Sequence, residues 1–215
     1  SALLSPIHIQ ESSAPLASNQ TVFADEQKKA ILEEIEKYCG SIEAFLQDAK
    51  ISLEQLEISG VIASQNREII FTILKEIPRY AGWATSRAYN SLKALLESGL
   101  IIETNYEEVF AILREIPQYA GSAAWRACDS LEALLKLGLI VKTNQKEIFT
   151  ILLEIPRYAG ETTSITYYSV KSLLESGLIT EANQEQVFAI LKETPRHAGS
   201  STLGAYNSLK DLRTL

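Results

Sequence analysis

The sequence predicts an all-α fold, a solenoid of about five two-helix units that repeat along the chain with a period of 39. Three observations carry this prediction. One heptapeptide recurs at a constant offset, which is the signature of a repeat architecture. Apolar residues within each unit fall at helical spacing, and no segment alternates apolar and polar residues with the period of two that a half-buried strand requires.

The recurring heptapeptide is EIPRYAG at residues 76–82, which returns with substitutions at 115–121, 154–160 and 193–199, always at the same offset. Aligned without a gap, residues 66–104 and 105–143 are identical at 23 of 39 positions. A divergent first unit is recognised because Leu53 and Leu56 match Leu92 and Leu95 at the same offset. The predicted units are 27–65, 66–104, 105–143, 144–182 and 183–215, numbered here 1 to 5.

Residues 1–26, which precede the units, carry no Lys or Arg and contain five serines and two prolines. They lack the charged start of a signal peptide, and we expect a linker or disordered tail. No apolar run approaches the ~20 residues that span a bilayer. Two unpaired cysteines are consistent with a reducing cytosol, so a cytoplasmic location is expected.

Each unit is interpreted as a helical hairpin, and residues 105–143 show the pattern. Asn105 is suited to cap the first helix, with Glu108 three residues on. Pro117 is expected to end or bend that helix, because proline lacks a backbone donor. The second helix should start near Gly121 and end at Gly138, where a left-handed residue is wanted.

Paired helices, a proline after the first and Leu-Leu-Glu-Ser-Gly-Leu-Ile at the end of the second, resemble HEAT and armadillo-like repeats over residues 27–215. The resemblance implies a right-handed α-α superhelix in which the second helices line the concave side. One departure is that Pro-Arg-Tyr-Ala-Gly stands in the turn where HEAT repeats usually carry an Asp-Arg pair.

Composition argues against several activities. The chain has 20 basic and 27 acidic residues and a net charge of −7, which disfavours nucleic acid and membrane surfaces as partners. Its two histidines are His8 and His197, and its two cysteines, Cys39 and Cys128, fall two units apart. We therefore expect no disulfide, no metal site, no cofactor and no catalytic residues.

The candidate binding residues are those that vary between units while their surroundings stay constant. They follow one stripe of the second helices, opposite the leucines. With their two arginine neighbours they are Trp83, Arg87, Asn90, Trp125, Arg126, Asp129, Tyr168, Leu203 and Asn207. The aromatic residues are either anchors for a partner or rings that lie against the turn of a neighbouring unit. The arginines either meet a partner's carboxylate or pair with a local glutamate.

Two further recurring features favour structural roles. Tyr80, Tyr119, Tyr158 and His197 occupy the same turn position in successive units and are expected to serve packing. Glutamate and arginine three residues apart, as in Glu154 with Arg157, are expected to form solvated pairs worth ~0.2–0.5 kcal/mol.

The preferred hypothesis is a non-enzymatic scaffold or adaptor that binds a peptide or protein on the face formed by the second helices, with the monomer favoured. The alternative is a HEAT-like enzyme that resembles alkylpurine DNA glycosylases, although the acidic chain lacks the positive field of such a groove. Deoxyhypusine hydroxylases need several His-Glu motifs, which two histidines cannot supply. A repeat protein with no evolved ligand is the third possibility.

Overall fold

A computed structural model describes residues 22–101 and 104–211, and this part of the chain contains helices and no strand. The α-helices are α1 (Asp25–Cys39), α2 (Glu43–Ile58), α3 (Arg67–Ala81), α4 (Thr85–Glu97), α5 (Tyr106–Ala120), α6 (Ala124–Leu135), α7 (Gln145–Ala159), α8 (Thr163–Glu175), α9 (Gln184–Ala198) and α10 (Thr202–Asp211). Short 3-10 turns join the helices of the last four hairpins: η1 (Gly82–Ala84), η2 (Gly121–Ala123), η3 (Gly160–Thr162) and η4 (Gly199–Ser201).

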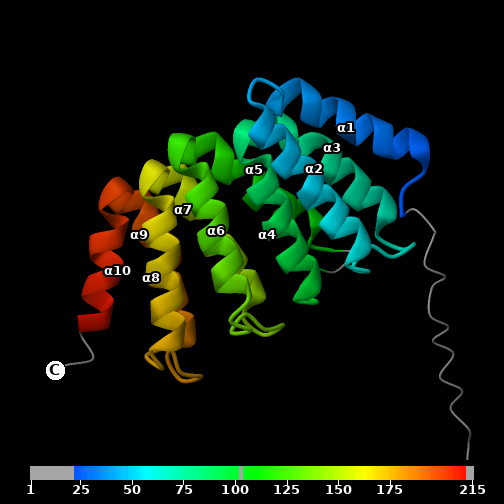
Figure 1. The fold of residues 1–215 in the computed structure, drawn as a ribbon. Helices are drawn as coiled ribbons and strands as arrows, with labels where there is room; N and C mark the ends of the chain where they lie inside the picture. Colours follow the sequence, from blue (N-terminus) through cyan, green and yellow to red (C-terminus); the bar gives the residue numbers. More distant parts are fainter. Residues whose placement is uncertain (1–21, 102–103, 212–215) are drawn as a thin grey trace, which may run out of the picture.

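The hairpins follow one another in a single curved row, from the blue end at α1 to the red end at α10 (Figure 1). The first helices α1, α3, α5, α7 and α9 pack side by side as one layer, and the second helices α2, α4, α6, α8 and α10 form the other. The predicted all-α repeat fold is therefore confirmed, with each hairpin packed against its neighbours in the chain.

The core lies between the two layers. Ile112 and Ile116 of α5 and Leu131 and Leu134 of α6 are fully buried, as the helical spacing of the apolar residues predicts. Burial of such a side chain stabilises the fold by roughly 1.5–3 kcal/mol. Because equivalent residues recur in every unit, one continuous apolar core runs through the stack.

Residues 22–26 belong to the fold, which corrects the predicted boundary of the tail at residue 26. Phe23 is buried, with its ring centroid 6.3 Å from that of Phe71 in α3, and α1 already begins at Asp25. Burial of this ring on the neighbouring hairpin explains why the ordered fold starts earlier than composition suggested. The rest of the predicted tail, residues 1–21, lies outside the described residues.

The predicted end of the second helix at Gly138 is confirmed. The predicted side-chain cap of the first helix by Asn105 is wrong. Gly138 follows α6 with φ +67°, as the left-handed position requires. Asn105 does precede α5, but its side chain makes no cap hydrogen bond and its Nδ2 donates to the Leu100 carbonyl at 2.8 Å. Asn144 acts likewise: Val141 N–H donates to its Oδ1 at 2.8 Å. These asparagines close the loop before the helix.

Of the two outcomes expected for Pro117, the first is wrong, because the first helix does not end at the preceding residue. α5 continues through Pro117 to Ala120, and Pro78, Pro156 and Pro195 also lie inside their helices. A proline leaves the carbonyl four residues earlier without its helical donor.

A tyrosine of the second helix supplies the missing donor in three units. Tyr89 Oη donates to the Leu74 carbonyl at 2.7 Å, four residues before Pro78. Tyr167 donates to the Leu152 carbonyl at 2.6 Å, and Tyr206 donates to the Leu191 carbonyl. The proline is tolerated in these units because its freed carbonyl is hydrogen-bonded within the core. In unit 3 the tyrosine position holds Cys128, which has no phenolic hydroxyl.

Candidate functional site

The nine predicted binding residues all lie along the second helices or the turn that leads into one, and the surface they form is called here the second-helix face. Trp83 lies in η1, Arg87 and Asn90 on α4, Trp125, Arg126 and Asp129 on α6, Tyr168 on α8, and Leu203 and Asn207 on α10.

The aromatic residues differ in how far they reach into solvent. Trp83 is 39% exposed, although its indole lies 5.8 Å from the Phe45 ring of the preceding hairpin, measured between centroids. Tyr168 is 49% exposed. Trp125 packs partly against the core, and the Arg126 guanidinium lies 5.0 Å from its ring centroid. Trp83 and Tyr168 are therefore the predicted aromatic residues with free apolar surface.

Sequence reasoning missed exposed apolar residues of the same face, among them Ile165 and Ile51; Ile58, at the end of α2, is exposed as well. Ile165, on α8, is 46% exposed and occupies the position of Arg87 and Arg126 in its own unit. Ile51, on α2, is 49% exposed and occupies the position of Tyr168. The repeat offset identifies both, provided that the stripe is extended to unit 1 and to the arginine position.

The charged members of the face are engaged within the protein. Arg87 Nε lies 3.6 Å from Asp129 Oδ1, so that this pair links α4 to α6. The partner of Arg87 is thus an aspartate of the next unit and not a local glutamate. Partial burial raises the pKa of Asp129, and the charge of Arg87 opposes that rise. Arg87 still keeps 48% of its side chain exposed, so the face presents both charged and apolar side chains to solvent.

Two serines of the stripe contact serines of the preceding hairpin. Ser86 Oγ lies 2.7 Å from Ser52 Oγ of the preceding hairpin, and Ser164 Oγ lies 2.8 Å from that of Ser130. In units 3 and 5 the position of Ser86 and Ser164 is occupied by Trp125 and Leu203. Asn207 accepts a hydrogen bond from Ser169 at 3.1 Å. These positions contribute to packing between units as well as to the surface.

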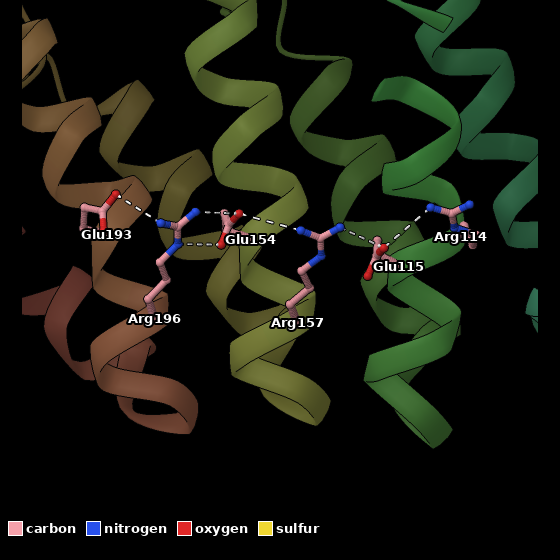
Figure 2. A network of polar contacts seen from close by, with 6 residues as sticks. All are labelled: Arg114, Glu115, Glu154, Arg157, Glu193 and Arg196. Carbon is pink, nitrogen blue, oxygen red and sulfur yellow. Dashed lines mark hydrogen bonds and ion pairs between the residues drawn. The ribbon is translucent and has the colours of Figure 1, made fainter. Parts of the chain in front are cut away.

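A chain of ion pairs crosses the first helices (Figure 2). Arg157 Nη2 lies 3.0 Å from Glu115 Oε1 of the preceding unit. Arg196 binds Glu154 with two hydrogen bonds, Nε to Oε2 at 3.0 Å and Nη2 to Oε1 at 3.1 Å. The predicted pairs three residues apart are present but longer in units 4 and 5, with Arg157 Nη1 3.8 Å from Glu154 Oε1 and Arg196 Nη1 3.7 Å from Glu193 Oε1. The ion pair expected between Glu76 and Arg79 is not formed.

These ion pairs correct the prediction of merely solvated glutamates. Glu115 is only 5% exposed, because the neighbouring unit covers it. The hydrogen bond to Glu115 raises the pKa of Arg157 above its usual range, which keeps the guanidinium charged. The chain of pairs links successive units, so its role is structural.

The described residues hold no group of three or more His, Cys, Asp or Glu side chains placed to bind a metal ion. His197 lies on α9, and His8 is outside the described residues. Cys39 and Cys128 are free and buried. Burial raises the pKa of Cys128 to about 12, so its thiol is protonated at neutral pH and is a poor nucleophile.

Comparisons of the chain with protein-family models, with curated proteins and with solved structures found no match. Among the helices of the described residues, none is long and apolar enough to cross a membrane. The second-helix face and the repeat fold are therefore the features of the molecule that bear on its function.

Proposed function

We propose that the protein is a non-enzymatic scaffold of the HEAT or armadillo-like type, which binds a protein or peptide through the second-helix face. The observation that carries the proposal is the exposure of Trp83 and Tyr168 on that face. Large aromatic side chains that keep free apolar surface are the residue type most often found as energetic anchors of protein interfaces.

The arrangement of the anchors favours an extended partner. Trp83 lies in the second hairpin of the row, and Ile165 and Tyr168 lie together in the fourth, so a single compact pocket does not collect all three. A stack of repeats presents an elongated surface, which suits a peptide, a helix or the edge of a folded protein. The net charge of −7 favours such a partner over nucleic acid.

Affinity capture with the tagged chain, followed by mass spectrometry, tests the proposal when it is run with two double variants. Trp83→Ala with Tyr168→Ala removes the anchors. The matched control is Tyr119→Ala with Tyr158→Ala, which removes tyrosines that are 41% and 43% exposed but lie on the first helices α5 and α7.

A partner that binds wild type and control alike, and the anchor variant at least about 10-fold more weakly, supports the proposal, since anchor residues contribute about 1–2 kcal/mol or more. Equal binding by all three chains contradicts it. Retention of duplex DNA at moderate salt would favour the glycosylase-like alternative, and capture of no stoichiometric partner would favour a repeat without an evolved ligand.

A further inference from the structure

Specific contacts join the first two units and the last three units. At the interface between units 3 and 4, Arg157 pairs with Glu115, and Ser130 pairs with Ser164. At the interface between units 4 and 5, Arg196 binds Glu154 through two hydrogen bonds. The two arginine–glutamate contacts are charge-assisted, and each fixes the position of one first helix against the next, whereas the serine pair joins the second helices α6 and α8.

The interface between units 1 and 2 is stabilised by other contacts. Cys39 Sγ donates to the Gly82 carbonyl at 3.0 Å, and Gln27 Nε2 donates to Glu68 Oε1 at 3.1 Å. Aromatic pairs add to these bonds, since Phe23 packs on Phe71 and Phe45 packs on Trp83.

The interface between units 2 and 3 has an ion pair between its second helices, where Arg87 Nε lies 3.6 Å from Asp129 Oδ1, but it has none between its first helices α3 and α5. Gln118 stands at the position of Arg157 and Arg196, so the arginine that pairs with the glutamate of the preceding unit elsewhere is absent here, and Glu76 is exposed. Trp125 stands at the position of Ser164, and Ser91 donates instead to the Cys128 carbonyl at 3.0 Å.

The same interface is open on both layers. A groove of about 500 Å³ lies between α3 and α5, lined by Ile73 and Phe110 among others. A second groove of about 530 Å³ lies where α4 and α6 end, between Glu97 and Lys136. A groove of about 510 Å³ also separates α7 from α9, but there the Arg196–Glu154 pair spans the two helices. The absence of an ion pair between α3 and α5 leaves less free energy opposing displacement of these first helices, while the contacts between α4 and α6 hold the other layer.

We infer that the interface between units 2 and 3 is the principal point at which the solenoid bends. Trp83 and Trp125 lie on opposite sides of it, in η1 and α6, so bending changes the separation of these two residues on the second-helix face. Adjustment of that separation to a partner depends on the proposed function, whereas the bending itself does not and is measured without any partner.

Pulsed electron–electron resonance on the whole chain tests the inference with two matched pairs of spin labels. Glu68, Glu107, Lys146 and Glu185 are exposed and occupy equivalent positions in units 2 to 5. The pair Glu68→Cys with Lys146→Cys spans the interfaces 2–3 and 3–4, and the pair Glu107→Cys with Glu185→Cys spans 3–4 and 4–5. Helices pack ~8–10 Å apart, so both pairs report separations of roughly 20 Å. Cys39 and Cys128 are buried and stay unlabelled.

The inference requires a broader distance distribution for the pair 68–146 than for the pair 107–185. Gln118→Arg supplies the missing guanidinium and should narrow the first distribution alone, while Arg196→Gln should broaden the second alone. Distributions of equal width, or a first distribution that Gln118→Arg leaves unchanged, would overturn the inference. Because no partner is present, neither outcome bears on the proposed function.

Discussion

The hydrogen bond between a tyrosine and the carbonyl freed by a proline should contribute to the unfolding free energy of the protein. Unit 4 allows this contribution to be measured. Tyr167 and Leu152 are both fully buried, and the bond from Tyr167 Oη to the Leu152 carbonyl measures 2.6 Å. Tyr167→Phe keeps the ring and deletes only the donor. The Leu152 carbonyl then stays buried without a partner, because Pro156 has no N–H.

The expected cost of Tyr167→Phe is about 1–3 kcal/mol of unfolding free energy, the range for leaving a buried acceptor unsatisfied. Pro156→Ala supplies a backbone N–H that can donate to the same carbonyl. In the Pro156→Ala background, Tyr167→Phe should therefore cost less, by about 1 kcal/mol or more. Urea unfolding of the four chains, followed by circular dichroism, gives this coupling energy.

Unit 3 provides the matched comparison, since Cys128 stands where the tyrosine would be. Pro117→Ala should stabilise the protein more than Pro156→Ala does. In unit 3 the new backbone N–H can donate to the Leu113 carbonyl, which no tyrosine hydroxyl reaches, whereas in unit 4 Tyr167 already donates to the Leu152 carbonyl. If Tyr167→Phe cost the same in both backgrounds, and the two proline variants behaved alike, the proposed link between proline and tyrosine would be refuted.

Gln118→Arg should pair with Glu76 and stabilise the protein by ~0.2–1 kcal/mol, a gain that urea unfolding should show to shrink at 1 M salt. Gly160→Ala should cost at least about 1 kcal/mol in the same assay, because Gly160 has φ +53°, whereas Gly204→Ala, within α10, should stabilise by up to ~1 kcal/mol. The buried thiol of Cys128 has a pKa raised from 9.0 to about 12, so its stabilising effect is complete below pH 9 and is lost as pH rises toward 12. Between pH 9 and 10 the unfolding free energy of wild type should therefore fall more steeply than that of Cys128→Ala, by up to about 1.4 kcal/mol per pH unit, and parallel curves would contradict this.

The sequence repeat was enough to predict the order of the helices, because the same apolar spacing recurs in each unit and the same glycine stop recurs in units 1 to 4. The role of Pro117 could not be predicted from its own helix. The donor that makes an internal proline tolerable comes from a tyrosine of the following helix, as with Pro78 and Tyr89, and only the fold brings the two together. Local rules for helix ends describe the backbone and omit such tertiary donors.

The exposure of the second-helix face was predicted in part, whereas its contacts within the protein were not. Variation between units correctly identified exposed Trp83 and Tyr168, yet it could not show that Asp129 is paired with Arg87 across two hairpins. Likewise, Glu154 was expected to pair with Arg157 in its own helix, whereas its shorter bonds are to Arg196 of the next unit. Contacts between units depend on how the hairpins stack, and a single repeat does not contain that information.

Site-specific photocrosslinking tests most directly the claim that the second-helix face is the surface of contact. A benzoylphenylalanine is placed at Tyr168 in one chain and at Tyr158, on α7, in another; the two tyrosines are similarly exposed. After irradiation with the captured partner, we predict a covalent adduct from position 168 and none from position 158. An adduct from position 158 alone would place the partner on the first helices and contradict the account.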